Sequence, residues 1–250
     1  MEVHHHPKVE KKNFKEYFYE GLMIFLAVML GFFAENLREH LTDSEKEKHY
    51  MISLVSDLKT DTANATTYLN LETQLLTAMD SALRISTAQL HDLNKQDTFY
   101  FHFLLFFNSE FPFRQNDNTL VELRNAGGYS LIRNQNVIDS IISLVSFYEF
   151  VKDNEAFYHD DFLKVEDFTT RLIKIPFLPT GPNDNSIYPP LLQNTEVFTQ
   201  YDKQQLEQLY SLIQIERTEL DFYRLIVVKY KTKATALIAF LQKEYHLEKN

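Results

Sequence analysis

The chain contains one long run without a charged residue, GLMIFLAVMLGFFA at residues 21–34, which Glu20 and Glu35 bound. As an α-helix this run extends about 21 Å, whereas a bilayer core of roughly 30 Å needs about 20 mostly apolar residues. The flanks lengthen it, because aromatic residues that suit the headgroup level precede it and residues 36–39 continue without Pro or Gly. The run therefore favours a short transmembrane helix over residues 14–41.

Two alternatives to a membrane anchor compete with this interpretation. A core helix of a soluble protein can have this length, although it would be unusually apolar. A removable signal peptide needs a small-residue cleavage site after the apolar run, and the sequence FFAENLREHL offers no good one. We expect the anchor, and with it a domain tethered to a membrane.

One face of the apolar helix carries small side chains. Ala27 and Gly31 are four residues apart, and Ala34 and Glu35 continue the same face. Small residues at this spacing let helix backbones approach closely in lipid. Glu35 has two interpretations: it lies at the interface and pairs with Arg38 or water, or it locks a helix–helix contact with a partner. The pattern predicts a helix–helix interface at Ala27, Gly31, Ala34 and Glu35.

The composition favours long helices. Only 5 of the 250 residues are Gly, and most of the 7 Pro fall in one stretch near residues 175–194, so the remainder is almost free of helix breakers. We predict an all-α fold, in which the N-terminal transmembrane helix precedes a bundle of long antiparallel helices. The net charge of −10 and the lack of a basic patch argue against nucleic-acid binding. The absence of Cys excludes disulfides, thiolate catalysis and Cys-based zinc sites.

Apolar periodicity places the expected helices, and turn residues separate them. Asn134 is expected to cap one helix, and Gly127 and Gly128 to supply a left-handed C-cap that ends another. A capping box at residues 42–45 marks either a joint after the membrane helix or an exposed turn of one continuous helix. The expected helices cover residues 44–88, 99–107, 119–125, 135–158 and 202–247, with a Pro-rich loop at about 175–194.

Histidines and acids give only weak indications of a metal site. Glu155 and His159 have the i, i+4 spacing of helical metal ligands, and Asp160 lies beside them. Charged runs on helices are more often solvated faces, so we predict no metal, no cofactor and no catalytic residue. His102 lies in a dense apolar run and is expected to be a hydrogen-bonded core histidine. Residues 4–6, three successive His, are interpreted as a flexible tail or an added tag rather than a native site.

Two segments resemble the signatures of a known family. The first is LAVMLGFFAENLREHLTDSEKEKHYMISLVSDLKTD at residues 26–61, and the second is TLVELRNAGGYSLIRNQNVIDSIISL at residues 119–144. Both resemble segments of an uncharacterised bacterial family of small membrane-anchored, mostly helical proteins. The resemblance implies an N-terminal transmembrane helix in the bacterial cytoplasmic membrane and a helical extracytoplasmic domain. It implies no catalytic residues, and the Pro-rich loop and the last helix resemble the family only in general character.

Lys and Arg counts on the two sides of the apolar run slightly favour a cytoplasmic N-terminus. The expected organisation is a short cytoplasmic tail at 1–13, the transmembrane helix at 14–41 and an extracytoplasmic, periplasmic domain at 42–250. The favoured function is a non-enzymatic subunit or scaffold that contacts membrane lipid and forms a homo-oligomer or binds other cytoplasmic-membrane proteins. The alternatives are an extracytoplasmic ligand-sensing module that signals through a partner, and a metal-dependent hydrolase that uses Glu155, His159 and Asp160.

Overall fold

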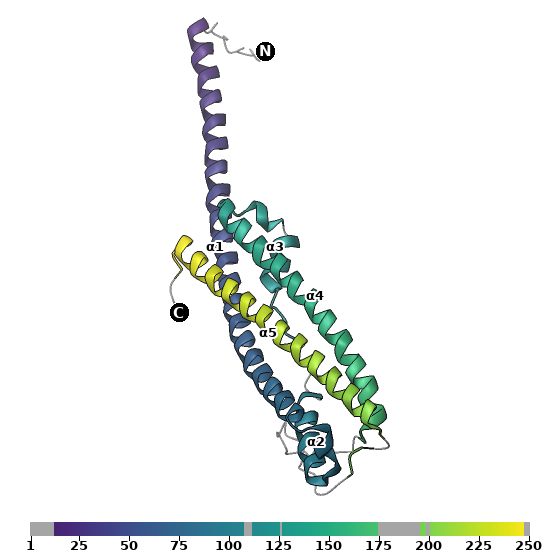
Figure 1. The fold of residues 1–250 in the computed structure, drawn as a ribbon. Helices are drawn as coiled ribbons and strands as arrows, with labels where there is room; N and C mark the ends of the chain where they lie inside the picture. Colours follow the sequence, from purple (N-terminus) through teal and green to yellow (C-terminus); the bar gives the residue numbers. More distant parts are fainter. Residues whose placement is uncertain (1–12, 108–111, 126, 175–195, 199–200, 248–250) are drawn as a thin grey trace, which may run out of the picture. The chain divides into compact units, whose positions relative to one another are not determined.

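The computed structural model describes residues 13–107, 112–125, 127–174, 196–198 and 201–247. Within these residues it is helical, apart from one isolated antiparallel bridge between Ile173 and Phe198. The prediction of an all-α fold is confirmed (Figure 1). The α-helices are α1 (Phe14–Leu83), α2 (Leu93–Phe107), α3 (Asn118–Asn125), α4 (Gln135–Leu172) and α5 (Lys203–Glu244), and two 3₁₀ helices are η1 (Thr87–His91) and η2 (Gly128–Ser130).

The chain divides into two compact units, residues 1–50 and residues 51–250. The first contains the N-terminal part of α1. The second is the bundle, in which α4 and α5 lie side by side in opposite directions (Figure 1). The part of α1 beyond residue 50 also runs antiparallel to α5, because Asp61 contacts Tyr230 whereas Asp80, further along α1, contacts Arg217. The predicted bundle of long antiparallel helices is thus present.

The core of the second unit follows the predicted stripes. On α1, Met51, Leu54 and Leu58 are almost completely buried, and on α5 the residues Leu209 and Ile213 are inaccessible to solvent. These positions recur at steps of three and four residues, which place them on one face of a helix. At the end formed by α2, aromatic side chains stack on one another, for example Phe99 on Phe103. Burial of these stripes is the main source of stability expected for such helices.

Several predicted helix boundaries are wrong. The helix expected at 44–88 is part of α1 and ends at Leu83, before η1; the helix expected at 99–107 already begins at Leu93; and the helix expected at 135–158 continues to Leu172. The last helix, expected at 202–247, spans Lys203–Glu244, close to the prediction. Residues 42–45 do not cap a helix start, because the Thr42 hydroxyl donates to the Arg38 carbonyl inside α1 (2.9 Å). Of the two interpretations of that motif, the exposed turn of one continuous helix is confirmed.

The two glycines after α3 serve different purposes. Gly127 has φ +65°, the left-handed conformation that was predicted. Gly128 is not left-handed and starts η2; a Cβ there would lie 2.8 Å from Leu123 Cδ2 and 3.1 Å from Leu123 Cα. Gly128 is therefore needed for close approach to α3, which corrects the prediction of a paired left-handed cap. The predicted cap at Asn134 is confirmed, since its side chain accepts from the Asn136 N–H (2.9 Å).

Candidate functional site

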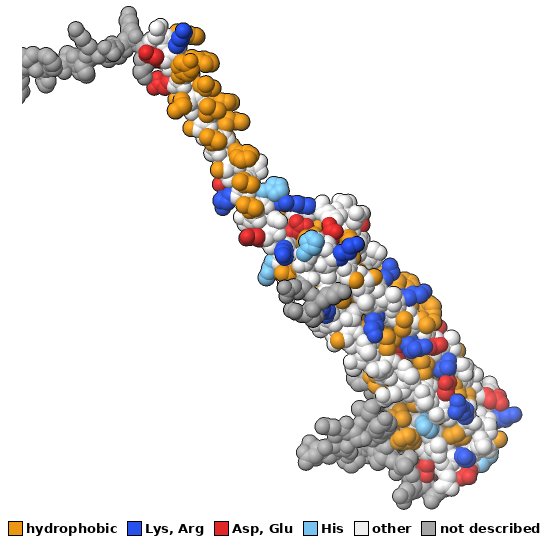
Figure 2. All heavy atoms as spheres, turned by 90° about the vertical axis from the view of Figure 1, so that its left-hand side faces the viewer, with side chains coloured by type: hydrophobic (Ala, Val, Ile, Leu, Met, Phe, Trp, Pro, Cys, Tyr) orange, Lys and Arg blue, Asp and Glu red, His pale blue; other side chains and the backbone are white. Residues whose placement is uncertain are grey.

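The N-terminal part of α1 exposes an uninterrupted apolar surface. Among the described residues, α1 is the helix long and apolar enough to cross a membrane, with a mean hydropathy of 1.8 over 18 residues and none of that window buried. Figure 2 shows hydrophobic side chains along this segment. Its most exposed large side chains include those of Met23, Phe32 and Phe33, each about 70 % exposed. A core helix of a soluble protein would be mostly buried. The structure thus supports a candidate membrane span at this position.

The predicted contact face lies on this exposed segment. Nothing lies within 4 Å of a Cβ added at Gly31, so the helix surface there is open in the single chain. Ala27 and Ala34 are also exposed. Glu35 receives two hydrogen bonds from the Arg38 guanidinium one turn further on, with a closest N–O distance of 2.5 Å. This ion pair agrees with the interpretation that Glu35 pairs locally, and a contact with a partner stays a prediction.

The second candidate site is a set of acids and phenols inside the bundle, here called the acid–tyrosine cluster: Asp61, Tyr68 and Glu72 of α1 and Tyr223 and Tyr230 of α5. Asp61 has no exposed surface. Its Oδ1 accepts from the Asn116 N–H (2.6 Å), and its Oδ2 accepts from the Tyr230 hydroxyl (2.8 Å). Burial raises the pKa of Asp61 to about 6, although both hydrogen bonds stabilise the charged form.

Glu72 is the second buried acid of the acid–tyrosine cluster. It is 1 % exposed and accepts a hydrogen bond from the Tyr68 hydroxyl. Burial raises the pKa of Glu72 to about 8, so its carboxyl group is mostly protonated at neutral pH. The Tyr68 ring meets Tyr223 edge-on at 6.0 Å between centroids, and Tyr223 stacks on Tyr158 of α4 at 6.1 Å. The cluster therefore links α1, α4 and α5 in the centre of the bundle.

The chemistry available to the acid–tyrosine cluster is limited by its position. Perturbed acids in a cleft are candidates for general acid–base catalysis. Here both carboxyl groups are buried, and neither Asp61 nor Glu72 lines the two pockets described below. Both carboxyl groups are thus closed to solvent in this conformation. The geometry instead makes the cluster a structural element whose stability depends on pH.

The acids and histidine considered as metal ligands are not brought together. Glu155 forms an ion pair with Arg114, which lies between α2 and α3 in the chain. His159 and Asp160 are exposed on α4. Among the residues that the structure describes, no group of three or more His, Asp or Glu could hold a metal ion. The three His at residues 4–6 and the Pro-rich loop at 175–194 lie outside the described residues.

His102 borders an apolar groove of about 340 Å³ between α1 and α2. Thr73 and Thr77 line the α1 side, but their hydroxyls donate to carbonyls of their own helix at 2.8 Å, so they add little polarity. Burial lowers the pKa of His102, which favours the neutral form of the ring. His102 was expected to be a hydrogen-bonded core histidine. This prediction is wrong for its Nδ1 atom, which is buried and has no hydrogen-bond partner among the described residues.

The buried acids are functional candidates that the sequence analysis did not identify. Asp61 follows Leu58 by three residues, and Glu72 follows Tyr68 by four, so both fall on the buried stripe of α1. An acid at a stripe position is the signal that could have revealed them, because burial of a carboxylate is costly. The hydroxyl partner of Asp61, Tyr230, lies 169 residues further on, and no sequence pattern specifies that pairing.

Comparison with known proteins identifies no relative. No protein-family model, no curated protein and no solved structure matches the chain. The resemblance of residues 26–61 and 119–144 to a membrane-anchored family stays a prediction.

Proposed function

We propose that the protein is a non-enzymatic, membrane-anchored subunit or scaffold that associates with other membrane proteins or with copies of itself. The observation that carries this proposal is the exposed, uncharged segment of α1 at residues 21–34. In water this surface would be unfavourable by about 25 cal/mol per Å² of apolar area, whereas in a bilayer it matches its surroundings.

In this proposal α1 crosses the bacterial cytoplasmic membrane once, with the N-terminus in the cytoplasm and the helical domain on the periplasmic side. The excess of Lys before the segment supports this orientation. The open helix surface at Gly31 supports a contact in lipid through Ala27, Gly31 and Ala34. The partner is another transmembrane helix, from a second copy or from another membrane protein.

The test of this contact uses the full chain extracted from membranes in mild detergent. We expect Gly31→Leu to reduce the fraction of protein that co-purifies with its partner or with itself, because the new side chain separates the helix backbones. Gly21→Leu is the matched control, since Gly21 is also open to solvent but lies on another face. Assembly of the same strength in Gly31→Leu as in Gly21→Leu, or a strictly monomeric native protein, would refute the proposed contact, whereas assembly that is weakened but still present would not.

The apolar groove beside His102 favours one second candidate function, a ligand-sensing domain that signals through a partner. Its lining suits a small molecule with an apolar body and one polar group. Octanoate is a suitable probe. A rise in the melting temperature with octanoate, abolished by Ala78→Phe in the groove, would support sensing. No shift with octanoate at millimolar concentration would count against this candidate.

A further inference from the structure

The outer surface shared by α4 and α5 carries exposed aromatic and aliphatic side chains. On α4, Phe150 is 46 % and Phe157 is 70 % exposed; on α5, Phe222 is 51 % and Leu225 is 48 % exposed. Large apolar side chains that are this exposed and lie together on one surface are typical of interaction sites on proteins. Both helices pack on the core through their opposite faces, so this surface is not covered by the described part of the chain.

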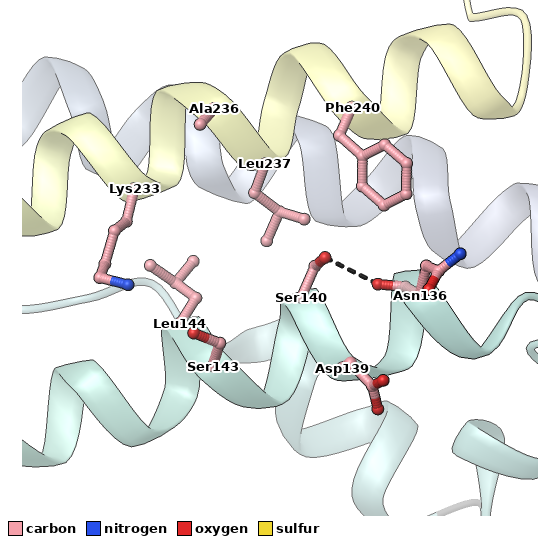
Figure 3. A pocket seen from close by; sticks show the side chains of 9 residues that line it. All are labelled: Asn136, Asp139, Ser140, Ser143, Leu144, Lys233, Ala236, Leu237 and Phe240. Atoms are coloured by element: carbon pink, nitrogen blue, oxygen red, sulfur yellow. Dashed lines mark hydrogen bonds between the residues drawn. The ribbon is translucent and has the colours of Figure 1, made fainter.

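A hollow of about 500 Å³ lies between α4 and α5 at one end of this surface (Figure 3). Small side chains, Ser140 and Ser143 from α4 and Ala236 from α5, leave the space. Leu144, Leu237 and Phe240 give the hollow much of its apolar lining, and Asp139 and Lys233 line it as well. The Ser140 hydroxyl donates to the Asn136 carbonyl of its own helix (2.7 Å) and so does not require water. The hollow can therefore accept apolar side chains of a partner.

Acidic side chains of α4 and basic side chains of α5 flank this surface, so two copies of it have complementary charges. Asp139 and Asp153 lie on α4, fourteen residues apart, and Lys229 and Lys243 lie on α5 with the same separation, about 21 Å along each helix. All four are exposed. None of them forms an ion pair with another residue of the described ranges, although Asp139 accepts a hydrogen bond from Gln135 (2.9 Å).

The acids and lysines also lie at matching levels. Contacts between the antiparallel helices align Tyr148 with Tyr230, with ring centroids 5.7 Å apart, and Asn134 with Glu244, which are joined by a 2.6 Å hydrogen bond. This register puts Asp153 within about a turn of the level of Lys229, and Asp139 within about a turn of the level of Lys243. Each of the two aspartates on α4 thus lies across the surface from a lysine on α5 at nearly the same level.

We propose that the α4–α5 surface binds a second copy of the chain through a two-fold axis parallel to these helices. A rotation of 180° about such an axis leaves each residue at the same height along the helices. It places α4 of one protomer against α5 of its partner. Asp153 then meets Lys229 of the other copy, Asp139 meets its Lys243, and the exposed phenylalanines are buried between them. Each surface is the complement of itself, as a two-fold contact requires.

This proposal extends the assembly role proposed above to a second, separate surface. The test uses the full chain in detergent and in a Gly31→Leu background, so that only pairing through the helical domain is measured. One protein carries Lys229→Glu and Lys243→Glu, and the other carries Asp139→Lys and Asp153→Lys. Sedimentation or light scattering gives the mass of each protein alone and of the mixture.

We expect the Gly31→Leu protein to dimerise, each charge-reversed protein alone to do so at least about tenfold more weakly, and the mixture to recover a dimer. Lys95→Glu, an exposed change on α2, should leave pairing unchanged. A monomeric Gly31→Leu protein, a dimer that ignores the reversals, or a mixture that does not pair would each overturn the proposal. These results do not depend on the Gly31 contact, so the two proposals can fail separately.

Discussion

The two buried acids differ in how far their surroundings compensate for burial. Asp61 accepts two hydrogen bonds, from Asn116 and Tyr230, whereas Glu72 accepts one from Tyr68, and its Oε2 has no partner among the described residues. The pKa follows this difference: about 6 for Asp61 and about 8 for Glu72. A carboxyl group with few donors around it is more stable protonated.

Glu72 should make the bundle less stable as pH rises. Its folded pKa of about 8 exceeds the unfolded value of about 4.3, so the folded state holds a proton that the unfolded state releases. Stability is highest below the unfolded pKa and is lost as pH rises towards 8. Asp61 adds the same trend only up to about pH 6. Between pH 6 and pH 8 the loss should thus come from Glu72, at about 1.4 kcal/mol per pH unit.

Glu72→Gln should remove this loss, because the amide keeps an acceptor for Tyr68 and cannot ionise. Urea unfolding of the full chain in detergent, followed by circular dichroism at pH 6 and pH 8, measures the effect. The substituted protein should lose the fall in the free energy of unfolding between pH 6 and pH 8, and a small rise from His102, whose pKa is lowered by burial, should remain. Glu122→Gln, an exposed change on α3, should keep the wild-type slope. An unchanged slope in Glu72→Gln would show that Glu72 is charged in the folded state.

The glycine pair offers a comparison of two kinds of strain. Gly127→Ala forces a side chain into a left-handed conformation, which costs about 1–2 kcal/mol, but its Cβ meets nothing within 4 Å. Gly128→Ala brings a Cβ to 3.1 Å from the Leu123 Cα, so the backbone of α3 must move, at a cost of about 1–3 kcal/mol. Adding Leu123→Ala to Gly128→Ala should not restore the melting temperature, because the Leu123 Cα and carbonyl oxygen remain 3.1 Å from the new Cβ.

At the level of elements, α3 is held by a side chain from a distant helix. Asp57 of α1 accepts from the Thr119 N–H (3.0 Å) and the Thr119 hydroxyl (2.6 Å) in the first turn of α3, and from the Asn116 side chain (3.0 Å). A carboxylate at a helix N-terminus satisfies free N–H groups and complements the helix dipole. A helix of eight residues depends on such support, because short helices are marginal alone.

Asp57→Ala should therefore destabilise the bundle by about 1–3 kcal/mol, since it leaves the Thr119 N–H without its acceptor. Hydrogen exchange should show the loss concentrated in residues 118–125, while α4 and α5 keep their protection. Asp57→Asn retains an acceptor and should lose less. Equal protection of α3 in Asp57→Ala and in the wild type would show that packing of Leu120 and Leu123 alone holds this helix.

Helices were predictable from the sequence because their apolar spacing and the scarcity of Gly and Pro act locally. The end of α4 was not: charged residues 159–161 and 166–167 broke the apparent pattern, yet Phe162, Val165 and Thr169 continue the buried stripe to Leu172. The cap at Asn134 and the turn at Gly127 were predictable, since each depends on one residue. The acid–tyrosine cluster was not, because the hydrogen bond that joins Asp61 to Tyr230 links α1 to α5 across 169 positions of the chain.

For the whole molecule, the decisive question is whether the N-terminal part of α1 crosses a membrane. We expect the full chain to stay with the membrane fraction after a carbonate wash. Leu26→Arg combined with Leu30→Arg places two charges near the centre of the apolar run, each unfavourable by about 2.5–3.5 kcal/mol for insertion. This protein should move to the soluble fraction or fail to accumulate in membranes.

Val121→Arg is the matched control for that experiment, because Val121 is also exposed, at 40 %, but lies on α3 in the helical domain. It should remain with the membrane, as the wild type does. Release of the wild-type chain by carbonate would mean that its apolar segment is covered by protein rather than lipid. In that case Gly31 and its neighbours would contact another chain in water, and the Gly31→Leu change should then lower the solubility of the protein rather than separate two membrane helices.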